Sequence, residues 1–325
     1  MPECLSLVAE ISRAHERIAP FIRETYLQFS PFYSELTGAS VYFKCENLQL
    51  TGSFKLRGAL NKYLSLTSSE RQRGVVAAST GNHGKAVAYA SRVANPESQC
   101  PCMIFAPTDA DPLKLKAIRK MGADVQLSGF DCVEAESNAR EFSANHSQTY
   151  ISPYNDSDVI AGQGTIGLEI CKQLERVDAV IGSVGGGGML GGIASFVRDQ
   201  FPDCKIIGCS PENSNVMIQS LAKGRLLDLP STETLSDGTA GGVEAGSITF
   251  EVCQQHITHP VSVTETEIAD CLVEFIDRQG MLIEGAAAVA IAALLRSSQQ
   301  LAGKNVVVVL CGANISTQRL KSITS

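Results

Sequence analysis

The sequence predicts an α/β fold with two lobes, each built on an open parallel sheet. Short β-rich runs alternate with helical segments along the chain, a pattern typical of parallel α/β architecture. Several runs, above all VVVVLC at residues 306–311, are apolar without a period of two, as expected for strands that are covered on both faces. A β-sandwich or an all-helical bundle is therefore disfavoured.

The predicted elements follow in chain order. Residues 1–18 have a helical rhythm, and further helices are expected from residue 82, at 112–121, at 132–145 and in the Ala-rich segment 285–295. Strands are expected at residues 41–45, 75–79, 102–106, 124–127, 179–184, 205–210 and 306–311. Residues 74–146 contain three successive β-α units and are predicted to form a small mobile lobe, while residues 1–73 and 147–325 form the large lobe.

Composition narrows the class of protein. The chain has 325 residues, of which 44% are hydrophobic and 19% charged, values typical of a globular protein that folds completely. Its formal charge of −7 argues against a nucleic-acid partner. No apolar stretch reaches the roughly 20 residues that cross a bilayer, and the first residues lack the features of a secretion signal. We therefore expect no membrane partner and a cytoplasmic location.

The cysteines predict neither disulfides nor a metal site. Their number is odd, eleven, and they are scattered along a chain without a secretion signal, which fits reduced thiols. Cys100 and Cys102 are the closest pair, but no second pair follows at zinc-ligand spacing. An ordinary pair of loop thiols explains them.

A lysine at the start of a predicted helix is the first candidate for chemistry. Lys55 lies in TGSFKLRG, where the helix dipole favours anions and a cation is disfavoured. A solvated lysine is the ordinary interpretation. The functional interpretation is an amine whose charged form is disfavoured, so that it can attack a carbonyl and form a Schiff base.

The second candidate is the turn between strand 75–79 and the helix that follows. Its backbone N–H groups and the hydroxyls of Ser79 and Thr80 can face an anion such as a substrate carboxylate. An ordinary Ser/Thr helix cap is the alternative, and His83 is then a loop histidine with backbone partners. The turn alone does not decide between them.

The third candidate is a run of four glycines, Gly185 to Gly188, directly after strand 179–184. Such a loop lets the backbone wrap a phosphate, whose charge is stabilised by several N–H dipoles and a helix N-terminus. No Lys-Ser/Thr follows, so it is not a P-loop, and the spacing gives only an imperfect dinucleotide fingerprint. Close helix–sheet packing explains one or two glycines better than four in a row.

A reactive lysine, an anion-binding turn and a phosphate cup together indicate pyridoxal 5′-phosphate. The chain resembles the fold-type II pyridoxal-phosphate enzymes of the serine/threonine dehydratase and serine racemase family. The resemblance rests on SFKLRGA, STGNHGKAVA, AGQGTIGLEI, SVGGGGMLGGIA, LSDGTAGG, LIEGAAAVA and VVLCGAN, which occur in family order. It implies a tryptophan synthase β-like fold, an amino-acid substrate and a homodimer. STGNHG, DGTAGG and CGANIS also resemble a dehydratase branch associated with hydroxyectoine utilisation.

The resemblance also implies a role for each candidate residue. Lys55 would form the Schiff base with the cofactor and transfer the proton on one face of its ring. Ser79, Thr80, Asn82 and His83 would receive the substrate carboxylate. Around the cofactor, Phe54 would pack beside it, Asn82 would bind the 3′-oxygen, Gly185, Gly186, Gly187, Gly188 and Met189 would bind the phosphate, Glu284 would lie beside the ring, and Cys311 would face the pyridine nitrogen.

The sequence departs from the family pattern at two positions in the site. Cys311 stands where the family usually has serine, and a thiol is a weak partner for the ring nitrogen, so the ring should be a limited electron sink that favours β-elimination. Thr80 stands where racemases carry serine as a second acid/base and where many dehydratases carry alanine. Racemisation is then not preferred, because the threonine methyl crowds the turn.

A third departure concerns a metal. Related enzymes place a divalent cation near the segment after KIIGCS, whereas this chain has Ser210, Ser214 and Val216 at the matching positions. Hard cations require carboxylate or carbonyl oxygens, and Glu212 is displaced by two residues, so no metal is expected.

The sequence therefore predicts a pyridoxal-phosphate-dependent dehydratase (ammonia-lyase) of a β-hydroxy amino acid such as threonine or serine. Its products would be a 2-oxo acid and ammonia. The alternatives are an amino-acid racemase of the serine racemase type and a non-catalytic pyridoxal-phosphate or amino-acid binding protein. A dinucleotide-binding oxidoreductase is disfavoured, because no acidic residue lies at the fingerprint's expected distance.

Overall fold

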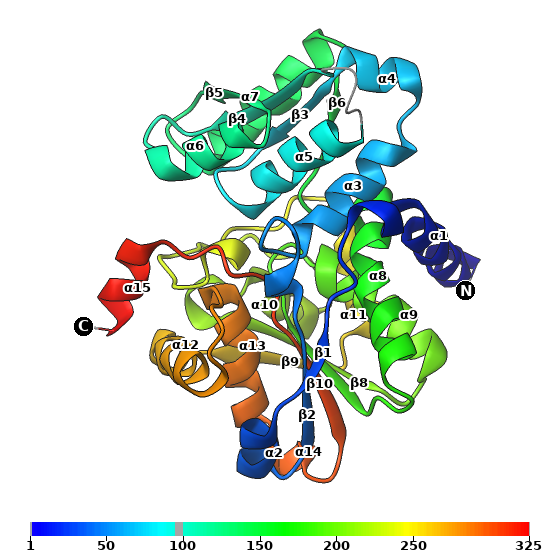
Figure 1. Cartoon of the computed structure of the whole chain (residues 1–325), viewed down its shortest axis with the longest axis vertical. Helices are drawn as coiled ribbons and strands as arrows, with labels where there is room; N and C mark the ends of the chain where they lie inside the picture. The colour runs from blue at the N-terminus through cyan, green and yellow to red at the C-terminus, as the bar shows by residue number, and fades with distance from the viewer. Residues whose placement is uncertain (1, 95–99, 325) are drawn as a thin grey trace.

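The computed structural model of the chain describes residues 2–94 and 100–324. Its strands form two separate sheets, and helices surround both (Figure 1). The smaller sheet lies at the top of the view and the larger one below it, with helix α3 (Lys55–Ser65) running between the two regions. The α/β class with parallel sheets is confirmed.

The larger sheet has six strands in the order β1-β2-β10-β7-β8-β9. All neighbours are parallel except β1 and β2. The four central strands were predicted to within two residues, and Val306 to Val309 in β10 are fully buried, as a sheet covered on both faces requires. The bounds are β1 Leu27–Phe29, β2 Ser40–Lys44, β7 Ala179–Ser183, β8 Lys205–Pro211, β9 His259–Val263 and β10 Asn305–Val309.

The smaller sheet has four parallel strands in the order β5-β4-β3-β6. Three of them agree with the prediction to within one residue. The fourth, β6, is only two residues long and follows the segment 74–146; the bounds and mobility of that lobe stay predictions. The bounds are β3 Val75–Ala78, β4 Cys102–Ala106, β5 Asp124–Leu127 and β6 Thr149–Tyr150.

The helices cover the faces of both sheets (Figure 1). α13 is the Ala-rich helix expected at residues 285–295, and it is buried almost throughout because it packs in the hydrophobic core around the larger sheet. The remaining bounds are α1 Pro2–Ile18, α2 Pro31–Thr37, α4 Ser68–Arg73, α5 Asn82–Val93, α6 Pro112–Lys120, α7 Cys132–Asn145, α8 Ser157–Gln173, α9 Gly188–Gln200, α10 Val216–Lys223, α11 Ile248–His256, α12 Glu265–Gln279, α13 Gly285–Arg296, α14 Ser298–Leu301 and α15 Thr317–Thr324.

Four charged side chains form a buried ionic cluster beneath α3: Lys44, Glu46, Arg57 and Glu169. Their side chains are at most 1% exposed, and their formal charges sum to zero. Arg57 donates to both carboxylates, at 2.8 Å to Glu46 and 2.6 Å to Glu169. Because Arg57 lies two residues after Lys55, the cluster fixes the first turn of α3 against β2 and α8.

The described part of the chain contains neither a membrane-spanning helix nor a disulfide. None of its helices combines the length and the apolar character needed to span a membrane. The ten cysteines with described side chains are all free thiols.

Candidate active site

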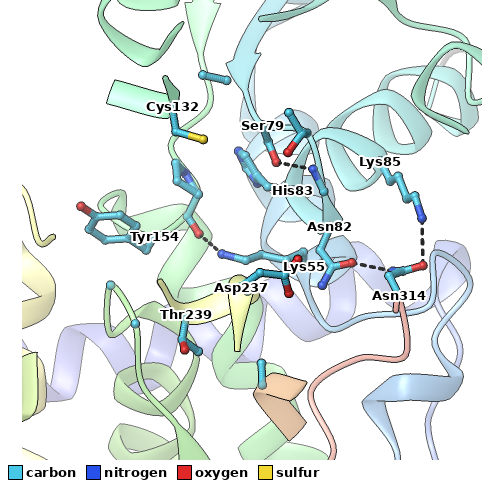
Figure 2. Close-up of a pocket in the computed structure, with 18 of the residues that line it drawn as sticks. Lys55, Ser79, Asn82, His83, Lys85, Cys132, Tyr154, Asp237, Thr239 and Asn314 are labelled. Atoms are coloured by element: carbon cyan, nitrogen blue, oxygen red, sulfur yellow. Dashed lines mark hydrogen bonds between the residues drawn. The ribbon is translucent and has the colours of Figure 1, made fainter. Parts of the chain in front are cut away.

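A cavity of about 460 Å³ lies between the two sheets, and every site residue predicted from the sequence lines it. Three of the lining segments follow the carboxyl ends of parallel strands: Ser79 follows β3, Gly185 follows β7 and Cys311 follows β10. This is the edge at which open α/β sheets bind ligands. Figure 2 shows the side chains converging on this space from both parts of the molecule.

Lys55 is the first residue of α3 and lines the cavity. Its Nζ donates a hydrogen bond to the carbonyl oxygen of Pro153 at 2.7 Å (Figure 2) and lies 5.2 Å from the centre of the Phe54 ring. Burial lowers the pKa of Lys55 to about 8, against the opposing influence of Cys311 and Glu284. About one tenth of the amine is therefore neutral and nucleophilic at pH 7.

The four glycines form a loop that packs too closely against its neighbours for side chains. A Cβ on Gly186 would lie 2.3 Å from the Tyr154 ring, and Gly187 has a φ of +85° that disfavours any other residue. Gly188 begins α9, so the loop presents backbone N–H groups together with the positive end of a 13-residue helix. The loop therefore fits a phosphate, and with Lys55 it fits the cofactor that the resemblance implies.

The turn after β3 is open toward the cavity. The N-cap residue of α5 is Gly81, and no side chain caps the helix. Ser79 Oγ instead accepts a hydrogen bond from the backbone N–H of Gly81 at 3.1 Å. The interpretation of Ser79 and Thr80 as ordinary helix caps is therefore wrong, and the uncapped N-terminus is suited to a carboxylate.

His83 is buried in the first turn of α5. Its Nε2 lies 2.8 Å from the carbonyl oxygen of Ile151. A carbonyl only accepts, so Nε2 carries the proton and donates it. Burial, helped by the charge of Lys55, lowers the pKa of His83 to about 3. The ring is therefore neutral at neutral pH and holds the turn in place without titrating.

Glu284, the N-cap residue of α13, and Cys311, just after β10, lie together in the cavity lining. Burial raises the pKa of Glu284, while hydrogen bonds from the Asn82 side chain and the Asn314 backbone oppose that shift. Burial also raises the pKa of Cys311 well above its usual range, so the thiol stays protonated. Its Sγ lies 3.9 Å from Glu284 Oε1 and 3.7 Å from Ser183 Oγ.

Several lining residues were not identified from the sequence. Asp237 and Asn314 belong to the motifs LSDGTAGG and CGAN, so the motifs marked them without assigning a role. Lys85 lies in the motif STGNHGKAVA, which assigned it no role, and Lys114 has no distinguishing local pattern. Tyr154 follows the two-residue strand β6, and no signal in its neighbourhood marked it; its hydroxyl accepts a hydrogen bond from the backbone of Glu244 at 3.0 Å.

The segment at which relatives were expected to bind a metal makes protein contacts here. Ser210 Oγ donates to the carbonyl of Val184, Ser214 Oγ accepts from Ser231, and Val216 is buried. Across residues 2–94 and 100–324, no group of three or more His, Cys, Asp or Glu side chains is arranged to hold a metal ion.

Chelation is therefore expected to leave activity nearly unchanged. Hydroxyl and apolar side chains at Ser210, Ser214 and Val216 offer a divalent cation no carboxylate. The measurement is the initial rate of product formation before and after treatment with a chelator, with magnesium and calcium added back. A large loss that magnesium restores would show that Glu212 and backbone carbonyls rebuild a site.

Comparison with known proteins covers almost the whole chain. Residues 18–312 match a family model described as pyridoxal-phosphate dependent enzyme. An L-threonine ammonia-lyase of Thermotoga maritima is 39% identical over 314 residues, which are 97% of this chain and 77% of that protein. A serine racemase of Dictyostelium discoideum is 35% identical over 327 residues, 99% of each chain.

A solved structure is similar over the entire length. The processed form of threonine deaminase isoform 2 from Solanum lycopersicum superposes with a TM-score of 0.94 at 34% identity, covering 100% of this chain and 88% of that one. The similarity extends through both sheets and therefore through every segment that lines the cavity.

Proposed function

Because the chain belongs to the family of pyridoxal-phosphate dependent enzymes, with pyridoxal 5′-phosphate as its cofactor, we propose that it is an ammonia-lyase of a β-hydroxy amino acid. Threonine and serine are the proposed substrates, and a 2-oxo acid and ammonia the products. The observation that carries the proposal is the one-sided supply of proton-transfer groups. Lys55 provides an amine with a lowered pKa, whereas His83 is neutral and its Nε2 is already bonded.

That asymmetry favours elimination. Loss of a β-hydroxyl needs a base for the α-proton and a proton for the hydroxyl that departs as water. One amine can take the first proton and return it to the hydroxyl, whereas racemisation needs an acid on the opposite face. In the proposed arrangement Lys55 Nζ removes the α-proton. The turn after β3 offers the hydroxyls of Ser79 and Thr80, and Ser79 Oγ already accepts a hydrogen bond from Gly81, so Thr80 would be the acid on the other side. The identity to an L-threonine ammonia-lyase supports the same conclusion.

Different residues of the cavity would bind the cofactor and the substrate. The chemistry that bound pyridoxal phosphate supplies is withdrawal of electrons from the α-carbon of the amino acid. Gly185 to Gly188 would hold its phosphate and Asn82 its 3′-oxygen, while the turn at Ser79 and Thr80 would orient the substrate carboxylate. The neutral Cys311 thiol, a weak hydrogen-bond partner, would leave the ring nitrogen without a carboxylate.

A panel of matched amino acids tests the proposal. Protein loaded with pyridoxal phosphate is incubated with L-threonine, L-serine and larger β-hydroxy amino acids, and with L-2-aminobutyrate and L-alanine, which lack the hydroxyl. We expect 2-oxo acid from at least one hydroxylated member of a pair and none from its partner. Absence of product from every hydroxylated compound would instead favour a binding protein without turnover.

A racemase is the second candidate, because Thr80 lines the cavity and a serine racemase is 35% identical. Replacing Thr80 by alanine should largely preserve 2-oxo acid formation, since the base lies on the Lys55 side. Replacing Thr80 by serine should raise racemisation relative to elimination, because the hydroxyl stays and the crowding methyl goes. Chiral chromatography and oxo-acid trapping follow both products in one reaction.

Loss of elimination in the alanine variant, with substrate binding retained, would contradict this assignment. Thr80 would then be a catalytic acid rather than a contact for the substrate carboxylate, and the division of work between the two sides of the cavity would be wrong.

A further inference from the structure

Lys85 is a cation in an unfavourable position. It lies in the first turn of α5, where the helix dipole disfavours positive charge. It is half-buried in the cavity lining, and burial lowers its pKa. Among the described residues no carboxylate lies within ion-pair distance of it, whereas the neighbouring Lys114 is paired with Asp237 at 3.2 Å. Its recorded polar contact is a hydrogen bond from Nζ to Asn314 Oδ1 at 2.8 Å (Figure 2).

This contact and one to Thr51 together determine how the Asn314 amide is oriented. An ammonium group can only donate a hydrogen bond, so the Asn314 oxygen must face Lys85. On the other side, Asn314 Nδ2 donates to the carbonyl oxygen of Thr51 at 3.0 Å, and a carbonyl can only accept. Both neighbours therefore require the same orientation of the amide.

The orientation passes on to Asn82. Asn314 Nδ2 also donates to Asn82 Oδ1 at 2.5 Å, which occupies the Asn82 oxygen (Figure 2). Asn82 Nδ2 then faces Glu284, at 2.9 Å from Oε1 and 3.0 Å from Oε2. A flipped Asn82 amide would set an oxygen against the carboxylate and two NH₂ groups against each other. The chain of contacts thus presents Asn82 to the cavity as a donor.

We propose that Lys85 is a positioning residue that fixes, through Asn314, the amide of Asn82 with its NH₂ group toward Glu284 and the cofactor. This inference rests on the proposed contact between Asn82 and the 3′-oxygen of the cofactor. A fixed N–H donor stabilises negative charge on that oxygen. It thereby lowers the pKa of the visible chromophore of the bound cofactor.

The positive charge of Lys85 also affects the pKa of the chromophore. This effect must be separated from the role of Lys85 as a hydrogen-bond donor to Asn314. Glu284 attracts Lys85, Lys114 repels it, and Asp237 partly neutralises Lys114. Lys85→Met and Lys85→Gln remove the charge equally. Only glutamine keeps an N–H that can reach Asn314 Oδ1, and Lys85→Arg keeps both the charge and the donor.

The experiment is a pH titration of the visible absorption band in the four proteins loaded with pyridoxal phosphate. Lys85→Met should raise the chromophore pKa by about one unit, the size expected for one lost hydrogen bond to a charged group. Lys85→Gln should shift it clearly less, and Lys85→Arg should restore the wild-type value. Thermal unfolding of each protein is measured as a control, and the shift in chromophore pKa should not follow the unfolding temperature.

Two outcomes would overturn the proposal. Equal shifts in the methionine and glutamine variants would mean that charge alone acts, and a wild-type titration in Lys85→Met would mean that the Asn82 amide needs no such support. The titration requires only bound cofactor. A wild-type protein that titrates as expected but forms no 2-oxo acid would therefore contradict the proposed function and leave this inference standing.

Discussion

Replacement of Lys55 by alanine is expected to lower turnover by at least about 10²–10⁴-fold, the usual contribution of a general base. Lys55 Nζ is the amine that lines the cavity with a pKa lowered to about 8. Alanine removes both the proposed covalent anchor of the cofactor and the proposed base. The measurement is kcat/KM of the variant loaded with pyridoxal phosphate, alongside its visible spectrum, which should lack the band that a lysine-bound cofactor gives before substrate is added.

A matched lysine replacement provides the control. Lys116 lies on α6 with its side chain exposed and lines no part of the cavity, so Lys116→Ala should retain wild-type turnover. Undiminished turnover in a cofactor-loaded Lys55→Ala protein would remove Lys55 from the mechanism.

The second large effect is expected in the buried ionic cluster. Glu169→Ala should lower the free energy of unfolding by about 3–5 kcal/mol, because it leaves Lys44 and Arg57 buried with Glu46 as their one carboxylate. Burial alone would raise the pKa of Glu169, but Arg57 and Lys44 hold it below its usual value. The measurement is denaturant-induced unfolding near neutral pH, followed by far-UV circular dichroism.

An exposed ion pair provides the control for the loss of stability expected in Glu169→Ala. Glu233 pairs with Arg319 at 3.0 Å, yet its side chain is 85% exposed. Glu233→Ala should therefore change stability by at most about 1 kcal/mol. Equal losses in the two variants would show that burial does not govern the energy of the cluster. Because the pKa of Glu169 is lowered by folding, its contribution should also disappear as the pH falls through that lowered pKa.

Local patterns predicted the central strands and the three site motifs, since each depends on a few consecutive residues. The strand β10 was visible as an apolar run, and the glycine loop as four consecutive glycines, each of which packs too closely against a neighbouring residue for a side chain. Strands β1 and β6 have three and two residues, too short for a period to show, and β9 contains Pro260, which is typical of an edge strand. These strands form through hydrogen bonds to an adjacent strand, and their own sequences carry no clear strand pattern.

The contacts that join distant residues could not be predicted in this way. Lys85 and Asn314 are 229 positions apart, and Arg57 and Glu169 are 112 apart. Nothing in the sequence marks Lys44 or Arg57 as buried, and only the fold shows that each is buried with a partner. The open N-terminus of α5 was likewise undecided until the structure identified Gly81 as its N-cap.

A product balance in one reaction tests the central claim most directly. Wild-type protein loaded with pyridoxal phosphate is given the best β-hydroxy amino acid of the panel, and ammonia, 2-oxo acid and the enantiomer of the substrate are quantified over time. The proposed arrangement of Lys55 and Thr80 predicts equal amounts of ammonia and 2-oxo acid from the start, with the enantiomer as a minor product. Accumulation of the enantiomer before any ammonia or 2-oxo acid would contradict it and identify a racemase.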